Sequence, residues 1–75
     1  MKVTIKLFAQ YREGRFKIET KEYEKGITIE EIMSQLSIGD EFPLGILMVN
    51  GKHESICYQP KEGDEIALFP KIGGG

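Results

Sequence analysis

The sequence predicts an α+β domain in which one amphipathic helix covers one face of a mixed β-sheet. Three observations lead to this prediction. Residues 2–8 and 16–23 alternate polar and apolar side chains, as half-buried strands do. Residues 28–36 combine a helix-start signal with apolar residues at helical spacing. Further short segments at 46–49, 52–56 and 65–69 are separated by turn residues, which is typical of strands.

The first two strands are expected to pair as an antiparallel hairpin. In the first strand the apolar face consists of Val3, Ile5 and Leu7. The link at residues 9–15 is expected to be a turn or one short helical turn. In the second strand one shared face consists of Phe16, Ile18 and Thr20.

The helix is expected to begin at Thr28, whose hydroxyl and Glu31 form the S/T-x-x-E pattern of a capping box. Glu30 and Glu31 also suit the positive end of the helix dipole, so capping accounts for both. One helical face carries Ile29, Ile32, Met33 and Leu36. The helix should end near residues 37–39, and a loop at 39–45 should tuck Phe42 and Leu44 against the core.

The second half of the chain predicts three short strands. A buried strand at 46–49 is followed by Asn50-Gly51, a strong hairpin signal because both residues tolerate positive φ. The chain should return as a strand at 52–56, turn at 61–64, and finish with a strand at 65–69 that Pro70 ends. With the last strand beside the first, four or five strands and one helix form the β-grasp, or ubiquitin-like, arrangement.

Length and composition limit the possible classes of protein. The 75 residues suit one domain, expected at 1–70, with a flexible glycine-rich tail at 71–75. The longest apolar run, 46–49, is far too short to span a membrane, and the N-terminal segment lacks the pattern of a signal peptide. Basic residues outnumber acidic ones in 1–25, but they alternate with Glu, so we expect a solvated strand pair and no nucleic-acid surface.

Cysteine and histidine usage argues against several kinds of site. The single cysteine, Cys57, favours a reducing, cytoplasmic compartment, because a secreted domain of this size usually carries several disulfides. One Cys and one His are too few for a zinc site, so we expect no metal and no cofactor. Cys57 could act as a thiol, but packing is the expected role; His53 is expected to be a solvated strand residue.

Two features of the sequence suggest contact with partners. On the polar face of the sheet an apolar patch is expected, formed by Phe8, Ala67 and Phe69, and such patches often mark a partner surface. Beyond Pro70 the sequence closes with Gly73, Gly74 and Gly75, which contribute no packing. A thread without side chains, reaching about 17 Å from Pro70, can enter a narrow tunnel on another protein. A frayed end remains the alternative.

The combination of these features resembles the MoaD/ThiS family of ubiquitin-like sulfur carriers. The resemblance covers nearly the whole chain. It is carried by the segment from Leu7 to Glu13, by Asn50-Gly51, and by the run from Gly63 to Pro70 followed by Gly74-Gly75. The chain departs from the molybdenum branch in having Lys71 after Pro70 and a third glycine, Gly73.

The resemblance implies a function in sulfur transfer. An E1-like enzyme of the MoeB/ThiF type would adenylate the Gly75 carboxylate, and sulfur would then convert it to a thiocarboxylate. The recipient would be the large subunit of molybdopterin synthase, the favoured branch, or thiazole synthase in thiamine biosynthesis. The chain itself would not be an enzyme, and its partner-binding residues would be Phe8, Ala67, Phe69, Lys71, Gly73 and Gly74.

Two alternatives use the same chain differently. A ubiquitin-like modifier would be conjugated to lysines on target proteins through Gly75. A plain binding module would carry an inert tail. The sequence does not separate these three functions.

Overall fold

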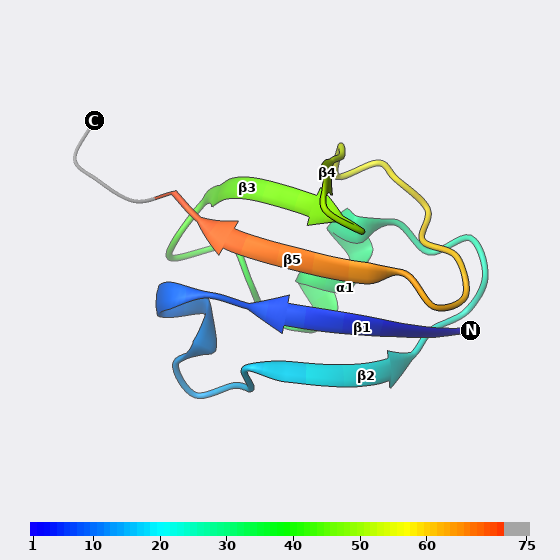
Figure 1. The fold of residues 1–75 in the computed structure, drawn as a ribbon. Helices are drawn as coiled ribbons and strands as arrows, with labels where there is room; N and C mark the ends of the chain where they lie inside the picture. The colour runs from blue at the N-terminus through cyan, green and yellow to red at the C-terminus, as the bar shows by residue number, and fades with distance from the viewer. Residues whose placement is uncertain (72–75) are drawn as a thin grey trace.

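The structure, a computed structural model, describes residues 1–71 and has the predicted β-grasp arrangement. A five-stranded sheet runs in the order β2-β1-β5-β3-β4, and one helix packs on one face (Figure 1). The strands are β1 (Lys2–Leu7), β2 (Ile18–Glu22), β3 (Leu44–Val49), β4 (Lys52–His53) and β5 (Glu65–Pro70). The helices are the 3-10 turn η1 (Ala9–Arg12) and α1 (Ile29–Gln35).

β5 is the central strand of the sheet. It lies beside β1, as predicted, and pairs with it in parallel; with β3 it pairs antiparallel. Alternate residues of these strands point toward α1 and form the buried core with the helix. The fully buried members are Val3, Ile5, Leu7, Tyr11, Ile29, Ile32, Ile66 and Leu68.

Both ends of α1 are capped by hydrogen bonds. At the start, the Thr28 hydroxyl accepts from the Glu31 amide at 3.2 Å and the Glu31 carboxylate accepts from the Thr28 amide at 3.1 Å, which confirms the predicted capping box. At the end, the Ser37 amide donates to the Ser34 carbonyl and the Ile38 amide to the Met33 carbonyl. These two bonds make a Schellman motif, in which Ser37 takes the left-handed position at φ 56°.

The Arg15 guanidinium adds a second cap at the end of α1. It donates from Nε to the Leu36 carbonyl at 3.1 Å and from Nη2 to the Ser37 carbonyl at 2.6 Å. A cation is favourable here because the last carbonyls of a helix carry partial negative charge. The segment after η1 is thereby tied to the helix.

The second strand differs from its prediction. Phe16 precedes β2 and packs against the core, whereas Ile18 and Thr20 lie on the outer face of the sheet, and Ile18 is 55% exposed. The register with β1 explains this, because Ile5 lies opposite Glu19 and Lys6 opposite Ile18. On the helix side β2 therefore presents Glu19 and Lys21, which form an ion pair at 3.1 Å on this edge strand.

The strands around the Asn50-Gly51 hairpin also differ in length from their predictions. β3 begins at Leu44, so Leu44 belongs to the sheet and not to the preceding loop; it still packs on the core, as does Phe42. β4 has only two residues, because the chain turns at Ser55, whose carbonyl accepts from the Tyr58 amide and whose hydroxyl accepts from the Cys57 amide.

A buried carboxylate secures the beginning of β5. Asp64 is 7% exposed and accepts three hydrogen bonds, from Asn50 Nδ2 at 2.9 Å, the Tyr58 hydroxyl at 2.8 Å and the Lys61 amide at 2.9 Å. Burial is the largest single influence and would raise the pKa of Asp64, but these bonds and the charge of Lys61 outweigh it and hold the pKa below its ordinary value. The hairpin and β5 are thereby joined through one ionised group.

Replacing Ser37 by glycine is expected to stabilise the protein by about 0.5–1 kcal/mol, because glycine adopts positive φ without a Cβ clash. The matched control is Ser34→Gly, the same change inside α1, which should cost about 0.5 kcal/mol. Urea unfolding of both variants measures this. A loss of stability in Ser37→Gly would contradict the strain at this position.

Asp64→Asn should lower the free energy of unfolding by about 1–3 kcal/mol near neutral pH, since it replaces one acceptor oxygen by an NH2 group and leaves at least one buried donor without an acceptor. A carboxyl with a lowered pKa stabilises the fold above its unfolded-state pKa of about 3.9, and loses this effect as the pH falls through its folded-state pKa. The difference from wild type should therefore shrink below about pH 4. Urea titrations across this range test it, with the exposed Asp40→Asn as control; a difference that does not vary with pH would contradict the ionised state of Asp64.

Candidate functional site

The predicted apolar patch lies on the face of the sheet opposite α1 and is larger than expected. Pairing between β3 and β5 places Ile46 opposite Phe69 and Met48 opposite Ala67, and the ring of Phe8, which follows β1, stacks on the ring of Phe69. Ile46 is 44% exposed, and the other members are half-buried. We call these five residues the outer-face patch: Phe8, Ile46, Met48, Ala67 and Phe69.

Two stacked aromatic rings form the middle of the outer-face patch. The rings of Phe8 and Phe69 lie 4.1 Å apart between centroids at an interplanar angle of 11°. The Arg12 guanidinium lies over the Phe8 ring at 5.1 Å from its centroid, and its Nε donates to the Leu7 carbonyl at 2.7 Å. The aromatic pair therefore has a cation beside its apolar surface.

The outer-face patch occupies the end of the sheet where β5 leaves it. Away from this end the same face is polar, with an ion pair between Lys6 and Glu65 at 2.7 Å and a hydrogen bond between the Thr4 and Thr20 hydroxyls at 3.1 Å. Figure 1 shows that β5 ends on the side of the sheet where η1 follows β1 and where β3 begins. The apolar surface therefore adjoins the start of the predicted tail.

Of the predicted tail residues, the structure describes Lys71. Its side chain is exposed, and its amide donates to the Pro43 carbonyl at 2.8 Å, so the chain is still held to the body one residue beyond β5. The other predicted site residues of the tail, Gly73, Gly74 and Gly75, lie outside the described residues.

Sequence reasoning missed Ile46 and Met48 as members of the patch. The apolar run 46–49 predicts a buried strand, but of its four residues only Leu47 and Val49 reach the core. The signal that would have found them is the lack of a second helix able to cover the outer face. Sequence reasoning also missed Tyr11, whose ring is buried and whose hydroxyl donates to the Phe42 carbonyl at 2.7 Å; burial raises the pKa of Tyr11.

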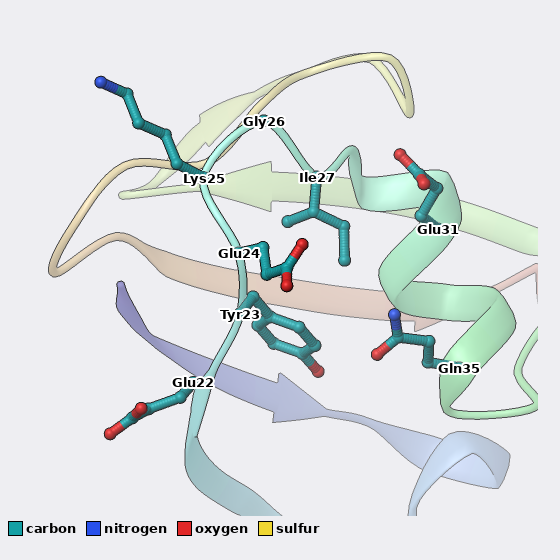
Figure 2. A pocket seen from close by; sticks show the side chains of 8 residues that line it. All are labelled: Glu22, Tyr23, Glu24, Lys25, Gly26, Ile27, Glu31 and Gln35. Atoms are coloured by element: carbon teal, nitrogen blue, oxygen red, sulfur yellow. The ribbon is translucent and has the colours of Figure 1, made fainter.

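A hollow lies between the end of β2 and α1, lined by residues 22–27, Glu31 and Gln35. In Figure 2 the side chains of Tyr23, Glu24 and Gln35 point toward it, while Glu22 and Lys25 project away. Glu31, on its rim, is already used in the capping box. The segment that follows β2 and lines the hollow lies at the end of the sheet where β5 begins, away from the end where β5 leaves the sheet (Figure 1).

The remaining candidates carry little chemistry. Cys57 is exposed, so its expected packing role is wrong, and His53 is an exposed residue of β4, as predicted. Within residues 1–71 no three His, Cys, Asp or Glu side chains gather closely enough to hold a metal ion. No helix in this range has the length and apolar character needed to cross a membrane.

Solved structures with the same fold include proteins of two kinds. A Pyrococcus furiosus protein classed as molybdopterin converting factor subunit 1 has a TM-score of 0.75 and 22% identity, over 96% of this chain and 99% of that one. Small archaeal modifier protein 1 from Haloferax volcanii has a TM-score of 0.73 and 23% identity, over 95% and 98%. A chain from the complex of subunits 1 and 2 of the Helicobacter pylori molybdopterin-converting factor has a TM-score of 0.64 and 19% identity, over 100% of both.

The comparison by sequence agrees with the fold. Curated protein sequences show no significant match to the chain. The sequence profile of the ThiS family, however, matches residues 5–75, which is nearly the entire chain. The chain therefore belongs to the ThiS family, within the MoaD/ThiS group of small ubiquitin-like sulfur carriers that act with partner proteins.

Proposed function

We propose that this protein is a sulfur carrier whose reacting group is the carboxylate of Gly75. An E1-like enzyme of the MoeB/ThiF type binds the chain and supplies the ATP site, which a domain of this size does not provide. The favoured use of the sulfur is synthesis of molybdopterin, for the molybdenum or tungsten cofactor, by the large subunit of molybdopterin synthase.

The chemistry takes place in two steps. A carboxylate oxygen of Gly75 attacks the α-phosphorus of ATP, which forms an acyl adenylate and releases pyrophosphate. A donor at the oxidation level of sulfide then attacks the acyl carbon, and AMP leaves with the original oxygen. The product is a thiocarboxylate, in which one oxygen has been exchanged for sulfur without net oxidation.

One observation carries the proposal: the ThiS family match extends through the glycines to Gly75. The position of the outer-face patch supports it, because a partner that binds the patch also lies next to the exit of the chain from β5. The exposed Lys71 and the Arg12 guanidinium border this surface, so we propose that the partner presents acidic groups around an apolar centre.

The likeness to a molybdopterin converting factor subunit supports the molybdopterin pathway over the thiazole pathway. The likeness to small archaeal modifier protein 1 keeps protein modification as a second candidate. In that function a target lysine displaces AMP from the same adenylate and forms an isopeptide bond. A ladder of conjugates in cells, lost on deletion of Gly75, would favour the modifier.

Intact mass spectrometry tests the carrier function directly. The protein is incubated with ATP, Mg²⁺, the E1-like enzyme from the same cell and a sulfide donor. We expect a mass gain equal to the exchange of one oxygen for sulfur, and no gain in the variant that lacks Gly75. The activity of the E1-like enzyme is first verified on another carrier protein that it adenylates. If this active enzyme then produces no mass gain in our protein, the proposal is overturned.

Phe69→Asp tests the outer-face patch as the docking surface. Burying an unpaired carboxylate against an apolar partner should weaken binding to the E1-like enzyme roughly 30-fold, about 2 kcal/mol. Calorimetry or interferometry measures the Kd. Ile46→Asp, at a more exposed position of the patch, provides a second variant should Phe69→Asp unfold.

The matched control is Ile18→Asp, an exposed isoleucine on the same face in β2, outside the patch. It should keep the affinity within about twofold. Wild-type affinity in both patch variants, or an equal loss in the control, would contradict the assignment of the surface.

A further inference from the structure

Gly45 packs against the backbone of Pro70 and Lys71, where the chain leaves β5, at a distance that leaves no room for a side chain. A Cβ on Gly45 would lie 2.8 Å from Lys71 Cα, 2.8 Å from the Pro70 carbonyl oxygen and 2.9 Å from the Lys71 nitrogen. These are backbone atoms, which cannot rotate aside as a side chain can. The φ of Gly45 is outside the left-handed region, so glycine is needed here for this close approach and not for its conformational freedom.

Gly45 also marks an irregularity in the sheet. The register between β3 and β5 shifts between Leu44 and Ile46, where Leu44 pairs with Pro70 and Ile46 with Phe69. A bulge of this kind ends regular pairing and redirects the chain. The shift occurs where β5 passes into Lys71.

Two hydrogen bonds complete the contact. The Pro43 carbonyl accepts from the Lys71 amide at 2.8 Å. The preceding carbonyl, of Phe42, accepts from the buried hydroxyl of Tyr11 at 2.7 Å, which connects this loop to η1 and the core. We call Tyr11, Phe42, Pro43 and Gly45 the tail anchor.

We propose that the tail anchor fixes the point and direction in which the chain leaves the sheet, and that Gly45 is a positioning residue for the reaction at Gly75. This inference rests on the proposed function. When a partner holds the four residues after Lys71 extended in a narrow channel, they span at most about 14 Å, and a displacement of Lys71 is passed on to the position of Gly75. A displacement of about 1 Å at a reacting group can cost on the order of 100-fold in rate.

Gly45→Ala probes this contact alone, because alanine accepts the local backbone and must push Lys71 away by several tenths of an ångström. We expect kcat for adenylation of Gly75, followed by ATP-dependent pyrophosphate release, to fall about tenfold or more. KM for the protein should stay within about twofold, since the outer-face patch still docks. Partial unfolding alone would lower the concentration of competent protein substrate, and so raise the apparent KM without lowering kcat.

Gly26→Ala is the matched control. Gly26 has positive φ, so the same substitution costs stability, but nothing lies within 4 Å of its Cβ position. It belongs to the segment after β2, at the end of the sheet opposite the end of β5 (Figure 1). Both kinetic constants should match wild type at a temperature where all variants are folded by circular dichroism. Equal kcat in Gly45→Ala and wild type would overturn the inference.

A readout on the free protein separates this inference from the proposed function. In Gly45→Ala, hydrogen exchange at the Lys71 amide should accelerate about tenfold or more, while exchange at Leu68 stays as in wild type. Unchanged exchange at Lys71 overturns the inference whether or not Gly75 is adenylated. If wild type itself is not adenylated, the proposed function fails, and the exchange result still decides whether Gly45 holds the exit.

A second variant covers the case in which Gly45→Ala does not fold. Tyr11→Phe keeps the buried ring and removes the hydroxyl that holds the Phe42 carbonyl, so it loosens the tail anchor from the other side. It should change Lys71 exchange and kcat in the same direction. Wild-type values for both measurements in a folded Tyr11→Phe would overturn the inference.

Discussion

The structure depends on β5 and its pairing with strands on both sides. β5 joins the N-terminal hairpin, through its parallel pairing with β1, to the second half of the chain, through its antiparallel pairing with β3. Its inward residues Ile66 and Leu68 are fully buried beneath α1. Without β5 the two halves share no ladder, since β1 and β3 are neighbours only through it. Both ends of β5 are held by groups from elsewhere in the chain, but the kind of contact differs between the two ends.

At its beginning β5 is held by a polar network, and at its end by close backbone packing. Asp64 accepts hydrogen bonds from Asn50, Tyr58 and the Lys61 amide. These bonds satisfy its buried charge and fix the start of β5 to the hairpin. The other end has Gly45 and a carbonyl against Lys71, with the apolar outer-face patch alongside. In the proposed function, a partner that binds the patch meets the chain at a defined starting point beside it. The two ends of β5 therefore differ: the Asp64 network holds the first, and the second adjoins the outer-face patch.

Most of the fold was predictable from local signals. The capping box at Thr28, the helical spacing of Ile29, Ile32 and Met33, and the positive-φ pair Asn50-Gly51 are short-range features whose physics does not depend on distant contacts. The face of β2 was not predictable in this way, because alternation shows that a strand has two faces but not which of them meets the helix. The register with β1 decides that, and it turns Ile18 outward. The two-residue β4 and the early start of β3 likewise depend on turns and ladders that form only in the folded sheet.

The sequence by itself determined the order of the elements, the β-grasp class, and the glycines that the ThiS family match includes. These follow from periodicity, capping and composition, all of which operate within a few residues. Only the tertiary structure decided that Ile46 and Met48 extend the patch, that Asp64 is a buried ionised group, and that Gly45 lies against Lys71. The physical reason is that each of these joins residues from different strands or loops. Such contacts are set by strand register and chain crossing, which no local pattern encodes.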